Sequence, residues 1–248
     1  MKYKKYPKEF WTNIKNTTKE IKEQGKPLVA AFDADGTLWD LDMGENLFHY
    51  TIEHKLVPLP ENPWEEYLQM KKISNDPRAA YLWLAQIYKG IPLSQVKKWA
   101  EEALQSITPV PIFSEQKELI SFFKSENVDV YIITASIKWA VEPGALLLGL
   151  EHDNVIGIET KVKDLIVTNE LKGIISYKKG KPEALKLKTG FFPFFASGNT
   201  EGDLELLESA THLKLAVSAA NRDDELYKTE FLLQETANKK NWMSHRFL

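Results

Sequence analysis

The sequence contains no cysteine among its 248 residues, which excludes disulfide bonds, thiolate catalysis and cysteine-ligated zinc. Only three arginines occur, Arg78, Arg222 and Arg246, so few side chains could grip a carboxylate or a phosphate with two parallel hydrogen bonds. The net charge of −3 supplies no basic field that would attract nucleic acid. No apolar run approaches the roughly 20 residues that span a bilayer, and the basic N-terminus leads into no signal-peptide pattern. We therefore expect a cytoplasmic protein that binds neither nucleic acid nor a membrane, and its oligomeric state stays open.

Short apolar segments alternate along the chain with longer amphipathic or polar segments. The apolar segments have the length and composition of strands that are buried on both faces of a parallel sheet. Strands that alternate with helices indicate an α/β fold, a three-layer, doubly wound parallel sheet. Residues 158–176 alternate between apolar and polar side chains, which suggests a β-hairpin. The predicted strands are 28–32, 128–133, 154–158, 191–196 and 213–217, and the predicted helices include 8–24, 114–126 and 137–149.

The segment 39–109 differs in character from the rest of the chain. It is rich in tryptophan, tyrosine and lysine, is interrupted by several prolines, and has no convincing strand pattern. We interpret it as a helical insertion that directly follows the first strand. The chain then divides into a catalytic core, residues 1–38 and 110–248, and an inserted helical domain, residues 39–109.

Three of the predicted strands end in small clusters of polar residues, and a lysine opens the helix between the second and the third. Because the carboxyl ends of parallel strands meet at one edge of a sheet, we expect these side chains to converge. Phosphoryl transfer requires such a set: a nucleophile, an acid/base, a cation, and donors for the phosphoryl oxygens. The residues are Asp33, Asp35, Thr134, Lys181, Asn199 and Asp203.

Asp33 and Asp35 are separated by one residue just past a strand, so their carboxyl groups can address one ligand from different directions. One can attack phosphorus while the other serves the leaving group. Two nearby carboxylates repel each other, and a divalent cation relieves this repulsion while it polarises a phosphoryl oxygen. Oxygen ligands and the absence of cysteine favour Mg²⁺ as the cofactor.

Four segments resemble the motifs of the haloacid dehalogenase superfamily, in the same order and with similar spacing over residues 28–220. Residues 32–39, with the sequence FDADGTLW, resemble its first motif, DxDGT after an apolar strand. Residues 131–134 resemble the second motif, an apolar strand that ends in Thr or Ser. Lys181 fits the third motif, and residues 198–203 fit the acidic fourth motif.

The resemblance implies a role for each of these residues. Asp33 would attack phosphorus and become an aspartyl-phosphate, and Asp35 would protonate the leaving oxygen and later activate water. Thr134 would hydrogen-bond a phosphoryl oxygen, and Lys181 would offset the negative charge around Asp33. Dehalogenases generally lack the second acid, so Asp35 favours a phosphatase. Mg²⁺ would be held by Asp33, Asp35, Asn199 and Asp203.

Two features of the motifs leave alternatives open. Lys178 and Lys179 are rivals for the role of Lys181, although Pro182 suits the first turn of a helix and favours Lys181. The fourth motif most often begins Gly-Asp, whereas this chain has Asn199, which offers a carbonyl oxygen but no charge. Asn199 therefore leaves a non-catalytic phospholigand-binding protein as one alternative, and a phosphomutase is the alternative among enzymes.

The insertion resembles the helical cap of the phosphoserine phosphatase-like branch, and such caps exclude water and select the substrate. Asp42 lies nine positions after Asp33, where phosphoserine phosphatases carry a Glu that contacts the substrate amino group. Arg78 could bind a carboxylate, whereas the many aromatic rings with a nearby acid suit a quaternary ammonium group. Such rings are more often core packing. We expect a small phosphorylated metabolite, phosphoserine- or phosphocholine-like. The predicted substrate-binding residues are Asp42, Glu45, Arg78, Gly36 and Ala135.

Overall fold

A computed structural model of the chain describes residues 3–73 and 76–248. The described residues form a seven-stranded sheet of β1 (Val29–Phe32), β2 (Asp129–Ile137), β3 (Val155–Lys163), β4 (Ile166–Lys172), β5 (Phe195–Gly198), β6 (Leu213–Ser218) and β7 (Met243–Arg246). The strand order is β4-β3-β2-β1-β5-β6-β7, and every neighbouring pair is parallel except the β3–β4 hairpin. β1 therefore lies at the centre, with its carboxyl end between those of β2 and β5.

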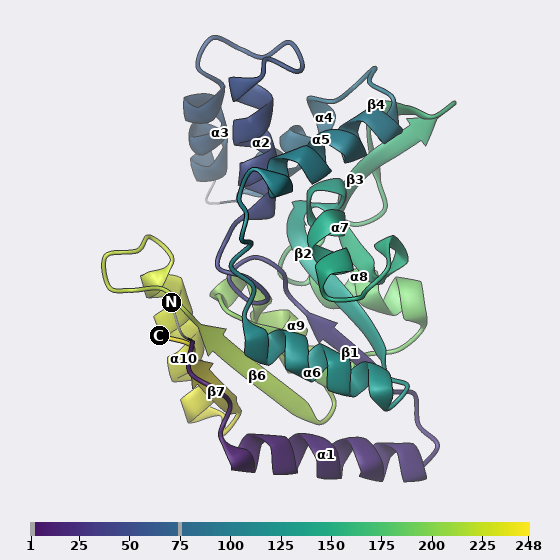
Figure 1. Cartoon of the computed structure of the whole chain (residues 1–248), viewed down its shortest axis with the longest axis vertical. Coiled ribbons are helices and arrows are strands. Elements are labelled where there is room, and N and C mark those ends of the chain that lie inside the picture. The colour runs from purple at the N-terminus through teal and green to yellow at the C-terminus, as the bar shows by residue number, and fades with distance from the viewer. Residues whose placement is uncertain (1–2, 74–75) are drawn as a thin grey trace.

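Helices cover both faces of the sheet (Figure 1). The side chains of β1 explain this arrangement, since Ala30 and Phe32 enter one apolar cluster while Val29 and Ala31 enter another. A strand that is buried on both faces needs helices on both faces, and the predicted three-layer α/β fold is confirmed. The first layer contains α1 (Lys8–Glu23), α6 (Ser114–Ser125) and α7 (Lys138–Leu147), and the other contains α8 (Gly180–Thr189), α9 (Leu204–Ser209) and α10 (Tyr227–Lys239).

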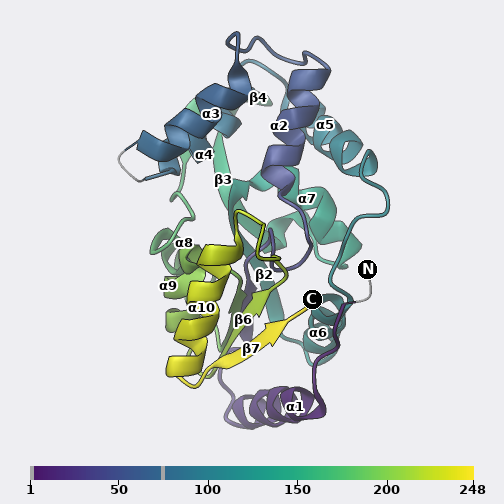
Figure 2. The ribbon, with the colours of Figure 1, turned by 90° about the vertical axis from the view of Figure 1, so that its left-hand side faces the viewer.

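The described residues of the insertion form the α-helices α2 (Met43–Glu53), α3 (Pro63–Lys72), α4 (Arg78–Gln86) and α5 (Leu93–Gln105). Figure 2 shows them above the carboxyl ends of the strands, at the end of the molecule opposite α1. Aromatic rings hold these helices together, because the ring centroid of Phe48 lies 5.7 Å from that of Tyr67 and 5.5 Å from that of Trp83. Most of the aromatic residues are therefore core packing. In the described residues, no helix is both long enough and apolar enough to cross a membrane.

The β3–β4 hairpin is joined to the insertion by main-chain hydrogen bonds. The amide of Gly90 donates to the carbonyl of Val167 over 2.8 Å, and the amide of Val167 donates to Ile91 over 2.9 Å. A third bond runs from the amide of Leu93 to the carbonyl of Leu165. The hairpin, which the sequence predicts at residues 158–176, thus extends the sheet beneath the inserted helices.

Several element boundaries differ from those predicted. β5 spans Phe195–Gly198 rather than 191–196, because Phe191 and Phe192 lie before the strand and are about half exposed. β2 continues beyond residue 133 to Ile137 through an irregularity in its pairing with β3. The strand at 213–217 is not the last, since β7 pairs with β6 in parallel after the crossover helix α10.

Candidate functional site

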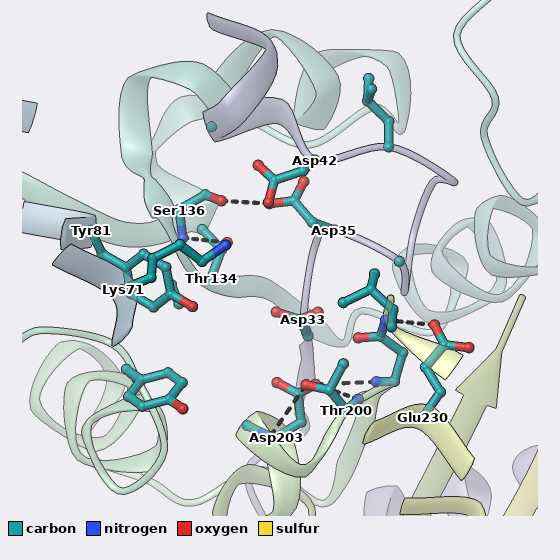
Figure 3. Close-up of a pocket in the computed structure, with 18 of the residues that line it drawn as sticks. Asp33, Asp35, Asp42, Lys71, Tyr81, Thr134, Ser136, Thr200, Asp203 and Glu230 are labelled. Atoms are coloured by element: carbon teal, nitrogen blue, oxygen red, sulfur yellow. Dashed lines mark hydrogen bonds between the residues drawn. The ribbon is translucent and has the colours of Figure 1, made fainter. Parts of the chain in front are cut away.

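A pocket of about 350 Å³ opens at the carboxyl ends of the central strands, beneath the insertion. This volume suits a small-molecule ligand. Figure 3 shows acidic side chains entering the pocket from several elements, with Asp33 near its centre. The six residues that the sequence predicts for catalysis and metal binding all line it, and they are Asp33, Asp35, Thr134, Lys181, Asn199 and Asp203.

A buried lysine joins two buried carboxylates at the base of the pocket. The Nζ atom of Lys181 lies 2.5 Å from Oδ1 of Asp33 and 2.5 Å from Oδ1 of Asp203. Lys181 is 3% exposed, Asp33 is 6% exposed and Asp203 is 1% exposed. Buried charges of this kind are stable only when they are paired, so the three groups form one electrostatic unit. Lys178 and Lys179 are not among the residues that line this pocket.

The burial of these groups changes their acid–base behaviour. Burial, with the added charge of Asp203, raises the pKa of Asp33 to about 7, although the Lys181 ammonium acts in the opposite direction. Burial alone would lower the pKa of Lys181, but the carboxylates of Asp203 and Asp33 raise it above its ordinary value. Lys181 is therefore a fixed positive charge beside Asp33.

The hydroxyl group of Thr37 connects the ends of β1 and β5. Its Oγ1 atom lies 3.0 Å from Oδ2 of Asp33 and 3.2 Å from Oδ1 of Asn199. The turn that carries Thr37 requires Gly36, which has a φ of +73° and lies so close to Asn199 that a Cβ atom would fall 2.0 Å from its Nδ2. The glycine of the first motif thus allows the carboxylate of Asp33 and the amide of Asn199 to approach each other.

Asp35 is held by three donors on the opposite side of the pocket. Oδ1 accepts hydrogen bonds from Nε1 of Trp39 at 2.8 Å and from the amide of Met43 at 3.0 Å. Oδ2 lies 2.5 Å from the hydroxyl of Ser136, and Figure 3 shows this contact. Burial raises the pKa of Asp35, although the hydrogen bonds from Met43, Ser136 and Trp39 lower it. A carboxyl group with a raised pKa is suited to proton transfer.

Thr134 is buried in the bend of β2, with its side chain on the pocket. Its Oγ1 accepts a hydrogen bond from the amide of Ser136 at 3.0 Å, and its carbonyl accepts one from the hydroxyl of Ser176 at 2.6 Å. The hydrogen bonds found across residues 3–73 and 76–248 include none in which the Thr134 hydroxyl is the donor. That proton is available for an oxygen atom of a ligand.

The predicted substrate-binding residues do not all reach the pocket. Asp42, Gly36 and Ala135 line it. Arg78 does not, because it begins α4 and its guanidinium group pairs with Asp76 at 2.6 Å on the surface. Glu45 does not line the pocket either.

Instead, Glu45 binds residues that do line the pocket. Its Oε1 atom accepts from Nζ of Lys71 at 2.9 Å and from the hydroxyl of Tyr67 at 3.1 Å. The structure therefore does not bring Arg78 or Glu45 to the pocket lining, where the sequence analysis expected them. Arg78 is paired outside the pocket, and Glu45 positions Lys71 and Tyr67 on α3.

The pocket also contains residues that the sequence analysis missed. Ser136 follows the predicted strand end by three positions, and Glu230 comes from α10, which was not predicted. Tyr81 and Tyr177 line the pocket from α4 and from the loop before α8. No local sequence pattern distinguishes these residues from structural ones, since long-range packing brings them to the site.

Acidic residues outnumber basic residues in the lining of this pocket. Both lysines are already paired, Lys181 with Asp33 and Asp203 and Lys71 with Glu45. The excess of negative charge favours a cationic ligand or cofactor. The acidic residues are Asp33, Asp35, Asp40, Asp42, Asp203, Asp224 and Glu230.

The donor atoms fit a hard, oxygen-preferring cation. In the described parts of the chain, no group of three or more His, Cys, Asp or Glu forms a metal site by itself. The Thr37 hydroxyl nevertheless brings the oxygen atoms of Asp33 and Asn199 together. One carboxylate with amide or main-chain oxygens is a donor set that suits Mg²⁺.

Comparisons with known proteins identify the family of the chain. The family model of haloacid dehalogenase-like hydrolases matches residues 30–208. Phosphorylcholine phosphatase of Pseudomonas aeruginosa is 24% identical over 179 residues, which cover 56% of this chain and 51% of that protein. The chain thus spans about half the length of this curated relative.

Solved structures share the fold at low sequence identity. A protein of unknown function from Bordetella pertussis Tohama I has a TM-score of 0.74 and 16% identity, with coverage of 90% of this chain and 99% of that chain. A phospho-aspartyl intermediate analogue of phosphoserine phosphatase has a TM-score of 0.55 and 16% identity, covering 90% and 94%. Substrate-bound phosphoserine phosphatase has a TM-score of 0.52 and 18% identity, covering 77% and 86%. The structural likeness supports the fold, and the family model covers well over half of the chain. The chain belongs to the haloacid dehalogenase-like hydrolase family.

Proposed function

We propose that this protein is a Mg²⁺-dependent phosphatase that hydrolyses a small phosphomonoester through an aspartyl-phosphate on Asp33. One observation carries the proposal: Asp33 and Asp35 line the same pocket, and only Asp33 contacts the ammonium group of a described lysine. Asp33 contacts the Lys181 ammonium at 2.5 Å, which favours its anionic, nucleophilic form. Among the described residues no lysine contacts Asp35, and an indole, a main-chain amide and the Ser136 hydroxyl hold its carboxyl group at the pocket, which suits a group that gives and accepts a proton.

In the first step, an Asp33 carboxylate oxygen attacks phosphorus. The bond from phosphorus to the ester oxygen breaks as the bond to Asp33 forms, and Asp35 gives its proton to the leaving oxygen. The Thr134 hydroxyl donates to a phosphoryl oxygen, and Lys181 offsets the negative charge that gathers there. These contacts position the reacting groups, which is the main contribution that a protein makes to phosphoryl transfer.

In the second step, water attacks the phosphorus of the aspartyl-phosphate. Asp35, now a carboxylate, accepts a proton from that water, and the bond between Asp33 and phosphorus breaks to release inorganic phosphate. Ser136 holds Asp35 in place for both steps through its 2.5 Å contact with Oδ2. One carboxyl group therefore serves as acid and then as base, and the enzyme returns to its starting state.

Mg²⁺ would be held by a carboxylate oxygen of Asp33, the main-chain carbonyl of Asp35 and Oδ1 of Asn199. When bound, it supplies charge neutralisation and polarisation of a phosphoryl oxygen. Asp203 holds Lys181 instead, because one of its oxygens contacts that lysine and the other accepts from the amides of Asn199 and Thr200 at 3.1 Å. This assignment gives Asp203 a positioning role beside the metal site.

We further propose that residues 39–109 act as a cap domain over a core of residues 1–38 and 110–248. α3 and α4 supply Tyr67, Lys71 and Tyr81 to the pocket, and the start of α2 supplies Asp42. Residues on an insertion can change without disturbing the catalytic edge of the sheet, so the cap is where substrate selectivity resides.

The chemistry of the cap favours a substrate that carries an ammonium group. Asp42 lines the pocket, and burial of its carboxyl group, together with the negative charges of Asp35 and Glu45, raises its pKa well above its ordinary value. A substrate cation would relieve this repulsion, and the ring of Tyr81, which lines the pocket from α4, offers a face for a cation–π contact. Arg78 pairs elsewhere, so phosphocholine-like substrates, which lack a carboxylate, are favoured over phosphoserine.

The test is phosphate release from a panel of esters with and without Mg²⁺. We expect metal-dependent turnover of phosphocholine or phosphoethanolamine above that of phosphoserine and of sugar phosphates, and no turnover by Asp33→Asn. Mg²⁺ binding without turnover of any ester would identify a non-catalytic binding protein. Transfer of phosphate to a second substrate hydroxyl instead of water would identify a phosphomutase.

A further inference from the structure

The oxygen of Asn199 that faces Asp33 is held in place by a second acidic residue behind it. Oε1 of Glu230, on α10, lies 3.0 Å from Nδ2 of Asn199. Both residues are 1% exposed, so this contact is shielded from water. Figure 3 shows the hydrogen bond reaching toward the pocket from Glu230.

A carboxylate can only accept hydrogen bonds, so the amide nitrogen of Asn199 must face Glu230. The amide oxygen must then point the opposite way, where it accepts from the Thr37 hydroxyl at 3.2 Å beside Asp33. Glu230 therefore orients the Asn199 side chain so that its oxygen atom, and not its nitrogen atom, faces the pocket. The hydrogen bond from Asn199 to a carboxylate also makes its oxygen a stronger donor to a cation.

The two oxygens of Glu230 have separate partners. Oε2 accepts from the hydroxyl of Ser218 at 2.7 Å and from the amides of Ala219 and Ala220 at 3.1 and 2.9 Å, which fixes the loop after β6. Oε1 has Asn199 as its partner in the described structure. The contacts of Oε2 stabilise the loop after β6, whereas the contact of Oε1 orients Asn199, which lines the pocket.

We propose that Glu230 is a positioning residue for the metal site, where Asn199 and Glu230 together replace the single aspartate that usually opens the fourth motif. In this arrangement the negative charge lies on Glu230, which is hydrogen-bonded to the metal ligand Asn199, and not on the ligand itself. This inference rests on the proposed Mg²⁺ site and assigns its orientation to a residue 31 positions further along the chain.

The pair makes an unusual prediction for N199D. Restoring the usual aspartate would place two buried carboxylates in contact, about 3 Å apart, and like charges at this distance repel. We therefore expect N199D alone to lower the thermal stability of the metal-free protein and to bring no gain in Mg²⁺ affinity. E230Q alone would set an amide group against the Asn199 amide group, so one of the two must rotate.

The experiment is a double-mutant cycle of N199D and E230Q, read by calorimetric Mg²⁺ binding and by thermal unfolding without metal. We expect E230Q to weaken Mg²⁺ binding by about tenfold or more, as loss of an outer partner does at other metal sites. The double variant N199D/E230Q exchanges charge and amide between the two positions, so it should regain wild-type affinity and stability. S218A is the matched control, because it removes a donor to Oε2 and should leave Mg²⁺ affinity unchanged.

The outcomes separate this inference from the proposed function. A wild-type protein that binds no Mg²⁺ contradicts the proposed metal site itself. A wild-type protein that binds Mg²⁺, with a folded E230Q of equal affinity, overturns the role of Glu230. If E230Q does not fold, the double variant decides: recovery of folding and affinity supports the exchange, and failure to recover overturns it.

Discussion

The two walls of the pocket are built differently. The catalytic wall, formed by Asp33, Lys181, Asn199 and Asp203, is almost entirely buried, and its polar groups contact one another at 2.5 to 3.1 Å. The cap wall, formed by Asp42, Tyr67, Lys71 and Tyr81, is mostly half-exposed or exposed. Buried charges tolerate few substitutions because each requires its partner, whereas exposed groups tolerate many. We therefore propose that the catalytic wall carries the chemistry and that the cap wall selects the substrate.

The largest effect is expected from the catalytic wall. Lys181→Met leaves the carboxylates of Asp33 and Asp203 buried without their cation, which should cost about 3–5 kcal/mol of unfolding free energy and abolish turnover. Denaturant unfolding without metal measures this cost. As a control, Lys181→Met with Asp203→Asn should recover part of the stability and none of the activity. A single variant as stable as the wild type would show that these charges are not one unit.

A smaller and selective effect is expected from the cap wall. Asp42→Asn should lower kcat/KM for phosphocholine by about 10- to 100-fold, the value of one charged contact. The control substrate is 3,3-dimethylbutyl phosphate, a neutral analogue of the same shape, whose turnover should not change. Equal losses on both substrates would mean that Asp42 acts on catalysis or folding and not on the ammonium group. Stability should be retained, because asparagine can also accept from the amide of Glu45 and cap α2.

A still smaller effect, that of pH on metal binding, is expected from Asp33. Its pKa of about 7 means that the metal-free protein carries a proton on this carboxyl group below pH 7. Mg²⁺ must displace that proton, so affinity should fall as the pH is lowered, by about tenfold between pH 8 and pH 6. Calorimetry at the two pH values measures the change. An affinity that is constant over this range would exclude Asp33 as the titrating ligand.

The smallest effect is expected at Arg78, outside both walls. Arg78→Ala removes a surface ion pair with Asp76, so stability should change by less than about 0.5 kcal/mol. Steady-state kinetics should give an unchanged kcat/KM for phosphoserine and phosphocholine alike. A selective loss with phosphoserine would show that Arg78 leaves Asp76 and reaches the substrate carboxylate.

The difference between the two walls also explains what the sequence could predict. Asp33, Lys181 and Asp203 follow or precede apolar segments whose ends are plain in the sequence, and parallel pairing brings those ends to one edge. The α/β fold and the helical insertion follow from the same apolar pattern. These features depend on local composition and on the geometry of a parallel sheet, which are general.

Contacts set by tertiary packing could not be predicted in this way. The sequence alone allows Arg78 to face the pocket. In the structure, its guanidinium group pairs instead with Asp76, two residues earlier in the chain. Glu230 was missed because it lies on α10, beyond the strand that the apolar pattern marks as the last. Ser136 was missed because its position depends on the irregular pairing of β2 with β3. This irregularity places the Ser136 hydroxyl beside Asp35.

The central claim is that Asp33 carries the phosphoryl group, and acid quenching during turnover with Mg²⁺ tests it most directly. Peptide mass spectrometry of the quenched wild-type protein should find one phosphoryl group on the peptide that contains Asp33, and Asp33→Asn should carry none and release no phosphate. A phosphoryl group on another residue, or phosphate release that survives Asp33→Asn, would contradict the account.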